Sequence, residues 1–487
     1  MHVKSVPESA ILTVAMRWSD RLIGLVSMII LARLLVPADF GIIVMASVVV
    51  GLIDVLLDLG VSTALIHNNE ASRDDYDTAW TIRLIQSALA GIVIFFSAPF
   101  VADYYNNPLV IDVLYVMALS VVVAGFENIG VVTFQKNMEF GKDFKFFFYK
   151  RVSGFVVTLI AAFILQSYWA MVIGAFAVRV VGVILSYQMH PHRPRLKLSR
   201  FKNIWSFSKW VLLRNVGAYL DSQFDKVLLG NRVDASTLGS YSVAHDVAAM
   251  PTTELLAPLG RVLFPAFVQK RDDPKMFANS ITTAIGIQAL VAVPACVGLA
   301  LVAEDAVSIL LGPNWTLVAP LIQIMAFTNL LIALTHSGSY ALLATGKVKL
   351  LAVVTWLQAI LFLGTAIWLF PQAEATEIAT IRVFVVAVGS LALIGIVLIQ
   401  IKALSTSTYF KPMIRPFLAA GIMAYILMHL HPELVHMMPI LRLIIEVIVG
   451  CLAYIASIIL FWSLFGRPEG AESYLFKNFL YKFKKTN

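Results

Sequence analysis

Charged residues and cysteines are scarce in this 487-residue sequence. Only 14% of the residues are charged and only two are cysteines, whereas a soluble domain carries about 25% charged residues. Hydrophobic residues make up 59% of the chain and its mean hydropathy is +0.83. This composition excludes a soluble enzyme, because one folded core cannot hide so much apolar surface. Cys296 and Cys451 both lie in apolar runs, which excludes a disulfide framework and a cysteine-based metal site.

Long apolar runs take up most of the chain. A membrane helix needs about 20 mostly apolar residues, and by that measure we predict an all-α, polytopic membrane protein with about fourteen transmembrane helices. The predicted spans are 10–34, 40–66, 78–101, 109–133, 146–166, 168–187, 207–230, 237–267, 277–303, 318–345, 348–370, 376–401, 412–430 and 438–465.

The distribution of cations predicts the orientation of these spans. The chain has 37 Lys and Arg against 29 Asp and Glu, a net charge of +8. If the spans alternate in direction, 26 of the 37 cations lie on one side, and only Arg33, Arg232 and Arg442 lie in the loops of the other side. Because cytoplasmic loops of membrane proteins are rich in Lys and Arg, we predict a multi-pass membrane protein with both termini in the cytoplasm. The basic excess therefore indicates orientation and not a nucleic-acid partner.

A weak internal repeat predicts two lobes. Aligning Gly41 with Gly239, an offset of 198, pairs Ile29-Ile30-Leu31 with Val227-Leu228-Leu229. Six spans in each copy give parallel repeats, as in transporters built from two lobes around a central cavity. The predicted domains are an N-terminal lobe (1–205), a C-terminal lobe (206–403), two added helices (404–466) and a basic cytoplasmic tail (467–487).

Cations inside the predicted spans are the candidates for substrate binding. A central charge costs about 2.5–3.5 kcal/mol in a membrane helix, so each must pair, line water or extend its charged end to the interface. Arg83, Arg261 and Arg382 lie near span ends and are expected to reach the interface. A guanidinium binds phosphate and carboxylate groups in a bidentate manner. We therefore predict that an anionic substrate binds to the deeper arginines, which are Arg17, Arg21, Arg179 and Arg214.

Carboxylates inside the spans are the candidates for ion coupling. The predicted set is Asp20, Asp54, Asp58, Asp221, Asp225 and Asp246. The alternative is that the Arg and Asp residues of the first two spans form ion pairs that only hold these helices together.

No cofactor or metal site is predicted. His429, His431 and His436 cluster in the last predicted outer loop, but Glu433 is the one acidic residue beside them in the sequence. A solvated loop is therefore the favoured interpretation.

Short motifs recur in order between about residues 10 and 400. They are 34–41 (LLVPADFG), 135–140 (QKNMEF), 225–230 (DKVLLG), 238–242 (LGSYS), 261–267 (RVLFPAF) and 311–315 (LGPNW). These motifs resemble those of Wzx-type polysaccharide flippases, which belong to the superfamily that also contains multidrug exporters and lipid II flippases. The resemblance implies a fourteen-helix, two-lobed transporter, not an enzyme. It would move an undecaprenyl-pyrophosphate-linked oligosaccharide across the inner membrane by alternating access, through a cationic cavity.

The same resemblance implies a pathway and partners. Such flippases serve exopolysaccharide, capsule or lipopolysaccharide O-antigen biosynthesis, and a proton or sodium gradient is the expected driving force, as in an antiporter. A polysaccharide polymerase and a chain-length regulator are further candidate partners. The alternatives are a cation-coupled multidrug exporter, a lipid II flippase on the same fold and a membrane-embedded polymerase. The buried arginines argue against the first, and the short predicted outer loops argue against the last.

Single substitutions of the deep arginines test the predicted cationic cavity. We expect Arg17→Ala, Arg179→Ala and Arg214→Ala each to reduce polysaccharide export, because each removes a charge that binds the anionic substrate. Immunoblots of membrane fractions should show unchanged amounts of protein. Normal export by all three variants would exclude the assignment.

Overall fold

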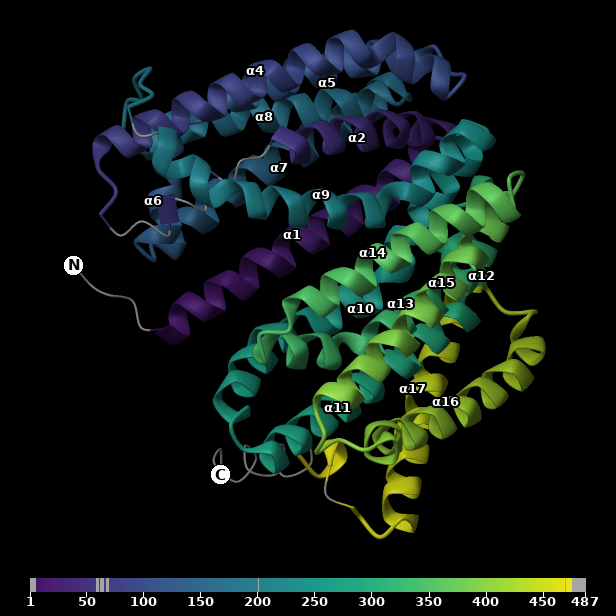
Figure 1. Ribbon diagram of the computed structural model, residues 1–487. Coiled ribbons are helices and arrows are strands. Elements are labelled where there is room, and N and C mark those ends of the chain that lie inside the picture. The colour runs from purple at the N-terminus through teal and green to yellow at the C-terminus, as the bar shows by residue number, and fades with distance from the viewer. Residues whose placement is uncertain are drawn as a thin grey trace. The chain divides into compact units, whose positions relative to one another are not determined.

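The computed structural model describes residues 6–57, 61, 65–66, 70–199, 201–468 and 470–474 (Figure 1). Within these residues the regular secondary structure is helical throughout. A helix satisfies its backbone hydrogen bonds within one segment, which a chain surrounded by lipid requires. The predicted all-α fold class is confirmed.

The long helices follow one another with short connections. Those of the first half are α1 (Val6–Leu34), α2 (Pro37–Leu57), α4 (Arg73–Tyr104), α5 (Leu109–Gly125), α7 (Phe140–Leu165), α8 (Trp169–Met189) and α9 (Phe201–Arg232). Those of the second half are α10 (Ala235–Lys270), α11 (Pro274–Leu301), α13 (Val318–Ala344), α14 (Val348–Gly364), α15 (Ala375–Gln400), α16 (Thr406–Leu434) and α17 (Pro439–Leu464). The short elements are η1 (Ile129–Val131), α6 (Val132–Lys136), α12 (Ala303–Leu310), η2 (Pro313–Trp315) and η3 (Thr365–Leu369).

Each predicted span overlaps one long helix of the described chain. Ten of these helices are long and apolar enough to cross a membrane, and a bent pair, Leu109–Gly125 with Ile129–Lys136, provides an eleventh candidate. The remaining long helices are α1, α9 and α10. The protein is therefore a multi-pass membrane protein, and the full count of fourteen spans stays a prediction.

Two span boundaries have a local physical cause. The division between the fifth and sixth spans falls at Gln166, which ends α7 in the left-handed conformation with φ of 45°. The predicted span over 109–133 is not one straight helix, because the chain bends by 67° between α5 and η1. Asn128 stabilises the bend: its side-chain oxygen accepts a hydrogen bond of 2.9 Å from the backbone N–H of Gly130, which starts a new helical segment.

The chain divides into two compact units, Met1–Gly239 and Ser240–Asn487. In the first unit α7 packs against α8, α4 against α5, α1 against α7 and α2 against α9. In the second unit α13 packs against α11 and α15, and α16 packs against α11 and α17. α9 belongs to the first unit, whereas the predicted lobe boundary at 205/206 falls within it. The predicted domain limits stay a prediction.

Two glycines make reciprocal contacts at the beginnings of α2 and α10. A Cβ atom on Gly41 would lie 1.8 Å from the carbonyl oxygen of Ala235, and one on Gly239 would lie 2.0 Å from the carbonyl oxygen of Pro37. The repeat offset of 198 relates Gly41 to Gly239 and Pro37 to Ala235. The two contacts are therefore equivalent under the repeat.

Gly41→Ala tests this close approach. The added methyl group collides with backbone atoms, so we expect destabilisation by about 1–3 kcal/mol, the usual effect of overpacking. Gly421→Ala is the control, because no atom lies within 4 Å of a Cβ there and alanine favours a helix more than glycine does. Thermal unfolding of the purified variants in detergent measures the difference. Equal stability of the two variants would contradict the packing.

Candidate functional site

Glu127 is the centre of an ion-pair network in the first unit. It lies in the bend between α5 and η1, and its side chain is 9% exposed. Lys150 Nζ on α7 is 2.6 Å from its Oε2 atom, and Arg83 Nη2 on α4 is 3.4 Å from its Oε1 atom. Each carboxylate oxygen therefore has its own cation. The side chains of Lys150 and Arg83 are 15% and 28% exposed.

A glycine makes room for this network. A Cβ atom on Gly182 of α8 would lie 2.7 Å from Cε of Lys150 and 3.0 Å from Oε2 of Glu127. The backbone of α8 therefore approaches the ion pair closely, and low exposure to water strengthens the attraction between the charges. The network joins α4, the bend after α5, and α7, and it carries one excess positive charge.

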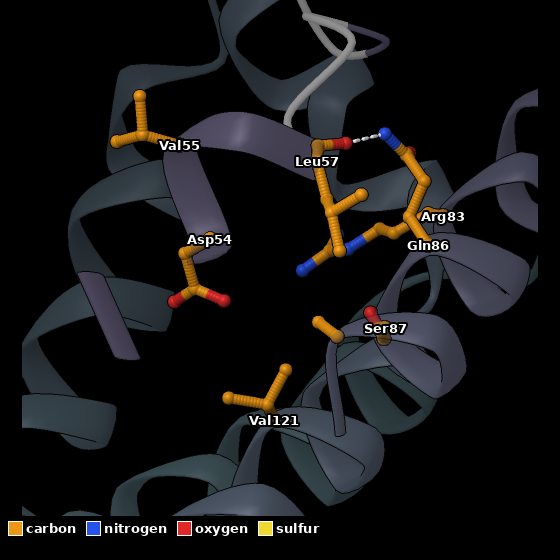
Figure 2. Close-up of a pocket in the computed structure, with 8 residues that line it drawn as sticks. Asp54, Val55, Leu57, Arg83, Gln86, Ser87 and Val121 are labelled. Atoms are coloured by element: carbon orange, nitrogen blue, oxygen red, sulfur yellow. Dashed lines mark hydrogen bonds between the residues drawn. The ribbon is translucent and has the colours of Figure 1, made fainter. Parts of the chain in front are cut away.

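Arg83 also lines a pocket of about 290 Å³ in the same unit. Figure 2 shows Asp54 of α2 and Arg83 of α4 extending into this pocket. Gln86 lies beside them and donates a hydrogen bond to the carbonyl of Leu57. The other lining residues are Val55, Leu57, Ser87, Ala90 and Val121. The pocket thus presents one carboxylate and one guanidinium on an otherwise largely apolar wall.

The connection after α8 is held against the beginning of α4. His192 Nε2 lies 3.1 Å from Oδ1 of Asp77, and the backbone N–H of Lys197 donates a hydrogen bond of 2.9 Å to Oγ1 of Thr81. Burial lowers the pKa of His192, although the carboxylate of Asp77 opposes this shift. Burial also lowers the pKa of His190, and the neighbouring His192 adds to the effect. Both imidazoles are therefore mainly neutral near pH 7.

Comparison with protein families identifies the class of this chain. A family model described as "Polysaccharide biosynthesis protein" matches residues 30–320, more than half of the chain. The chain belongs to this family.

Curated members of the polysaccharide biosynthesis family match over most of their length. The chain is 25% identical to the teichuronic acid biosynthesis protein TuaB of Bacillus subtilis, over 82% of this chain and 84% of that protein. It is 24% identical to the lipopolysaccharide biosynthesis protein WzxC of Escherichia coli, over 83% and 80% of the two chains. The succinoglycan biosynthesis transport protein ExoT of Rhizobium meliloti is 22% identical over 88% of both chains. These matches confirm the resemblance to Wzx-type polysaccharide flippases.

Solved structures show that the family member has a known transporter fold. The lipid II flippase MurJ in an inward closed conformation aligns with a TM-score of 0.77 and 12% identity, covering 93% of this chain and 99% of that chain. An inward-facing multidrug resistance transporter of the MATE family aligns with a TM-score of 0.59 and 13% identity, covering 80% and 96%. At these identities the likeness concerns the fold alone.

The structure distributes the predicted substrate-binding arginines over three helices of the first unit. Arg21 is exposed on α1 and Arg179 is partly buried on α8. Arg17 on α1 and Arg214 on α9 have side chains outside the described part of the chain. Their role as a cationic site stays a prediction.

The predicted ion-coupling carboxylates have different environments. Asp20 pairs with Arg151 of α7 at 2.9 Å, and Asp54 lines the pocket of Figure 2. On α9, Asp225 is buried and Asp221 partly buried. Asp246 is exposed on α10 beside His245, and Asp58 lies outside the described residues. Of the predicted set, Asp54 alone lines this described pocket.

The partners of three cations of this family member are not evident from its sequence. Arg83, for which an extension toward the interface is predicted, pairs with Glu127 and lines the pocket. Lys150 and Arg151 lie within α7, and their partners Glu127 and Asp20 come from other segments. The isolated carboxylate of Glu127 between apolar segments was the signal that a buried cation must be nearby.

Glu127→Gln tests the structural importance of the network. The substitution keeps the shape but leaves two cations without their carboxylate, and loss of one partner of a buried pair costs about 3–5 kcal/mol. Glu139→Gln is the matched control, because the Glu139–Lys142 pair is largely exposed and is worth about 1 kcal/mol or less. Thermal unfolding in detergent compares the variants. A loss for Glu127→Gln no larger than that of the control would refute the buried network.

Proposed function

We propose that this protein translocates undecaprenyl-pyrophosphate-linked oligosaccharide repeat units across the bacterial inner membrane. Its family membership and its relatives, which include a polysaccharide transport protein and a lipopolysaccharide biosynthesis protein, support a role in export of a cell-surface polysaccharide. The observation that carries the proposal is the pocket that Arg83 and Asp54 share inside a membrane-spanning unit.

Arg83 is suited to an anionic substrate. A guanidinium has five N–H donors, and Glu127 receives a hydrogen bond from Nη2 of Arg83, which leaves further donors for a ligand. Lys150 neutralises the same carboxylate, so Glu127 does not cancel the charge of Arg83 alone. The positive charge that remains favours pyrophosphate or an acidic sugar at this place. Arg17, Arg21, Arg179 and Arg214 extend the proposed cationic surface.

Asp54 is suited to ion coupling. A carboxylate at the pocket can bind a proton or a sodium ion, and occupation by either removes a negative charge that would repel the substrate. Release and rebinding of the ion then change the affinity of the pocket during alternating access. Asp20, Asp58, Asp221, Asp225 and Asp246 remain further candidates for this role.

The described pocket favours this function over a multidrug exporter on the same fold. An exporter of cations needs an excess of carboxylates at its binding site. The lining of this pocket instead has one carboxylate, Asp54, and one guanidinium, Arg83. A lipid II flippase shares the fold, but the similarity to MurJ is 12% in sequence, and the relatives with higher identity carry names from polysaccharide pathways.

Deletion of the gene and complementation test the proposal. Without the protein, complete lipid-linked repeat units should accumulate on the inner leaflet while surface polysaccharide is lost. Asp54→Asn and Arg83→Gln should restore less than about a tenth of wild-type export, since each removes a charge used in transport. Asp112→Asn, at an exposed aspartate of α5, is the control and should restore export fully. Normal surface polysaccharide in the deletion strain, with altered drug sensitivity, would overturn the proposal.

A further inference from the structure

A second polar cluster lies in the other unit, where α12, α16 and α17 meet. Asp305 comes from the first turn of α12, His431 from the last turn of α16 and Glu446 from α17. The expectation of a solvated loop with no partner other than Glu433 is wrong for His431, because α16 continues to Leu434 and brings the imidazole to Glu446.

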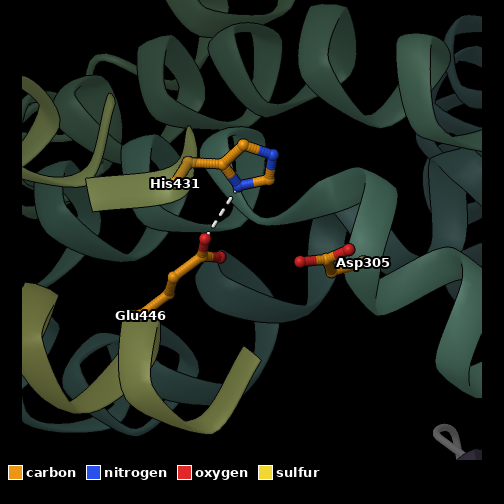
Figure 3. A group of neighbouring side chains, drawn as sticks. All are labelled: Asp305, His431 and Glu446. Carbon is orange, nitrogen blue, oxygen red and sulfur yellow. Dashed lines mark hydrogen bonds and ion pairs between the residues drawn. The ribbon is translucent and has the colours of Figure 1, made fainter. Parts of the chain in front are cut away.

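The three side chains converge on one point. Figure 3 shows them directed toward each other from three separate segments. Nδ1 of His431 lies 2.8 Å from Oε1 of Glu446, and one ligand atom from each residue lies within 4.8 Å of the other two. The Glu446 and Asp305 side chains are 3% and 5% exposed. Two buried carboxylates repel each other at this spacing, and Arg442 is a cation that the structure places beside them.

Arg442 fixes the position of Asp305. Its Nε and Nη2 atoms each donate a hydrogen bond to one oxygen of the Asp305 carboxylate. A carboxylate has about four lone-pair sites, so Asp305 can accept this fork and still bind an ion with a remaining lone pair. Arg442 therefore orients the Asp305 carboxylate and leaves lone pairs on it for a metal ion.

The cluster lines a cavity of about 270 Å³, which is large enough for an ion and its water ligands. Glu304, Asp305, Glu446 and His431 line it. The three carboxylates carry one negative charge each, and Arg442 balances one of them. Carboxylates therefore outnumber cations at this cavity, which favours a divalent cation.

We propose that Asp305, His431 and Glu446 bind a divalent transition-metal ion, with Zn²⁺ as the preferred ion. Zinc accepts both imidazole nitrogen and carboxylate oxygen as ligands, the imidazole favours a transition metal over Mg²⁺ or Ca²⁺, and water from the cavity supplies the fourth position. Ligand atoms around a tetrahedral Zn²⁺ lie about 3.4 Å apart. The separations of at most 4.8 Å therefore close with side-chain movements of about 1–1.5 Å, and the ion takes the place of the His431–Glu446 hydrogen bond.

The ion would cross-link three helices. It joins α16 and α17, the two helices that lie outside the predicted repeat, to α12 of the same unit. Binding to the folded protein stabilises it by mass action. The site does not depend on the proposed transport function, because it is measured by direct binding.

Binding of Zn²⁺ alone to the purified full-length protein, stripped of metal, tests the site. Calorimetry should show one Zn²⁺ per chain, and Mg²⁺ and Ca²⁺ should not compete. His431→Ala should weaken the affinity by about tenfold or more. The matched control is His429→Ala, because His429 lies on the same helix but stacks on Tyr425 at a ring distance of 4.2 Å and should bind like wild type. Zn²⁺ should also raise the thermal unfolding temperature of the wild type and not that of His431→Ala.

X-ray absorption of the wild-type zinc complex provides a readout that needs no variant. We expect one imidazole and otherwise oxygen ligands. Absence of binding below about 100 µM, equal affinity of His431→Ala and wild type, or a spectrum with sulfur or several imidazole ligands would each overturn the proposal.

Discussion

The interior of a bilayer offers no water, and the described structure follows from that constraint. Backbone groups find their partners within helices, and buried charges find theirs across helices. Glu127 binds Lys150 and Arg83, and Asp305 binds Arg442. Each pair joins segments that are distant in the sequence. Charges that would be costly in lipid therefore act as cross-links within each unit.

The same constraint explains why the candidate site lies next to a structural ion pair. Arg83 lies in largely apolar surroundings, and Glu127 accepts a hydrogen bond from its guanidinium. Lys150 shares that carboxylate, and the same guanidinium lines the pocket that contains Asp54. The network that holds α4, α7 and the bend after α5 in position therefore also fixes one of the charged groups of the candidate site.

The two C-terminal helices contact earlier helices of their unit and the segment that follows them. Near one end, Arg442 of α17 pairs with Asp305 and His431 of α16 contacts Glu446. Toward the other, Arg415 of α16 forms two hydrogen-bonded contacts of about 3 Å with Glu472. Between them the hydroxyl of Tyr454 donates to the carbonyl of Leu290 on α11. The segment after residue 402, where no motif resemblance was found, is therefore an integral part of the second unit.

Hydropathy and short motifs are local properties of the chain, so the sequence alone predicts the all-helical membrane fold, the approximate position of each long helix, the break at Gln166 and the family. It does not predict which charges meet. Lys150 pairs with Glu127, and His431 with Glu446. Both partners come from other segments, because the contacts between segments depend on packing that no local pattern records.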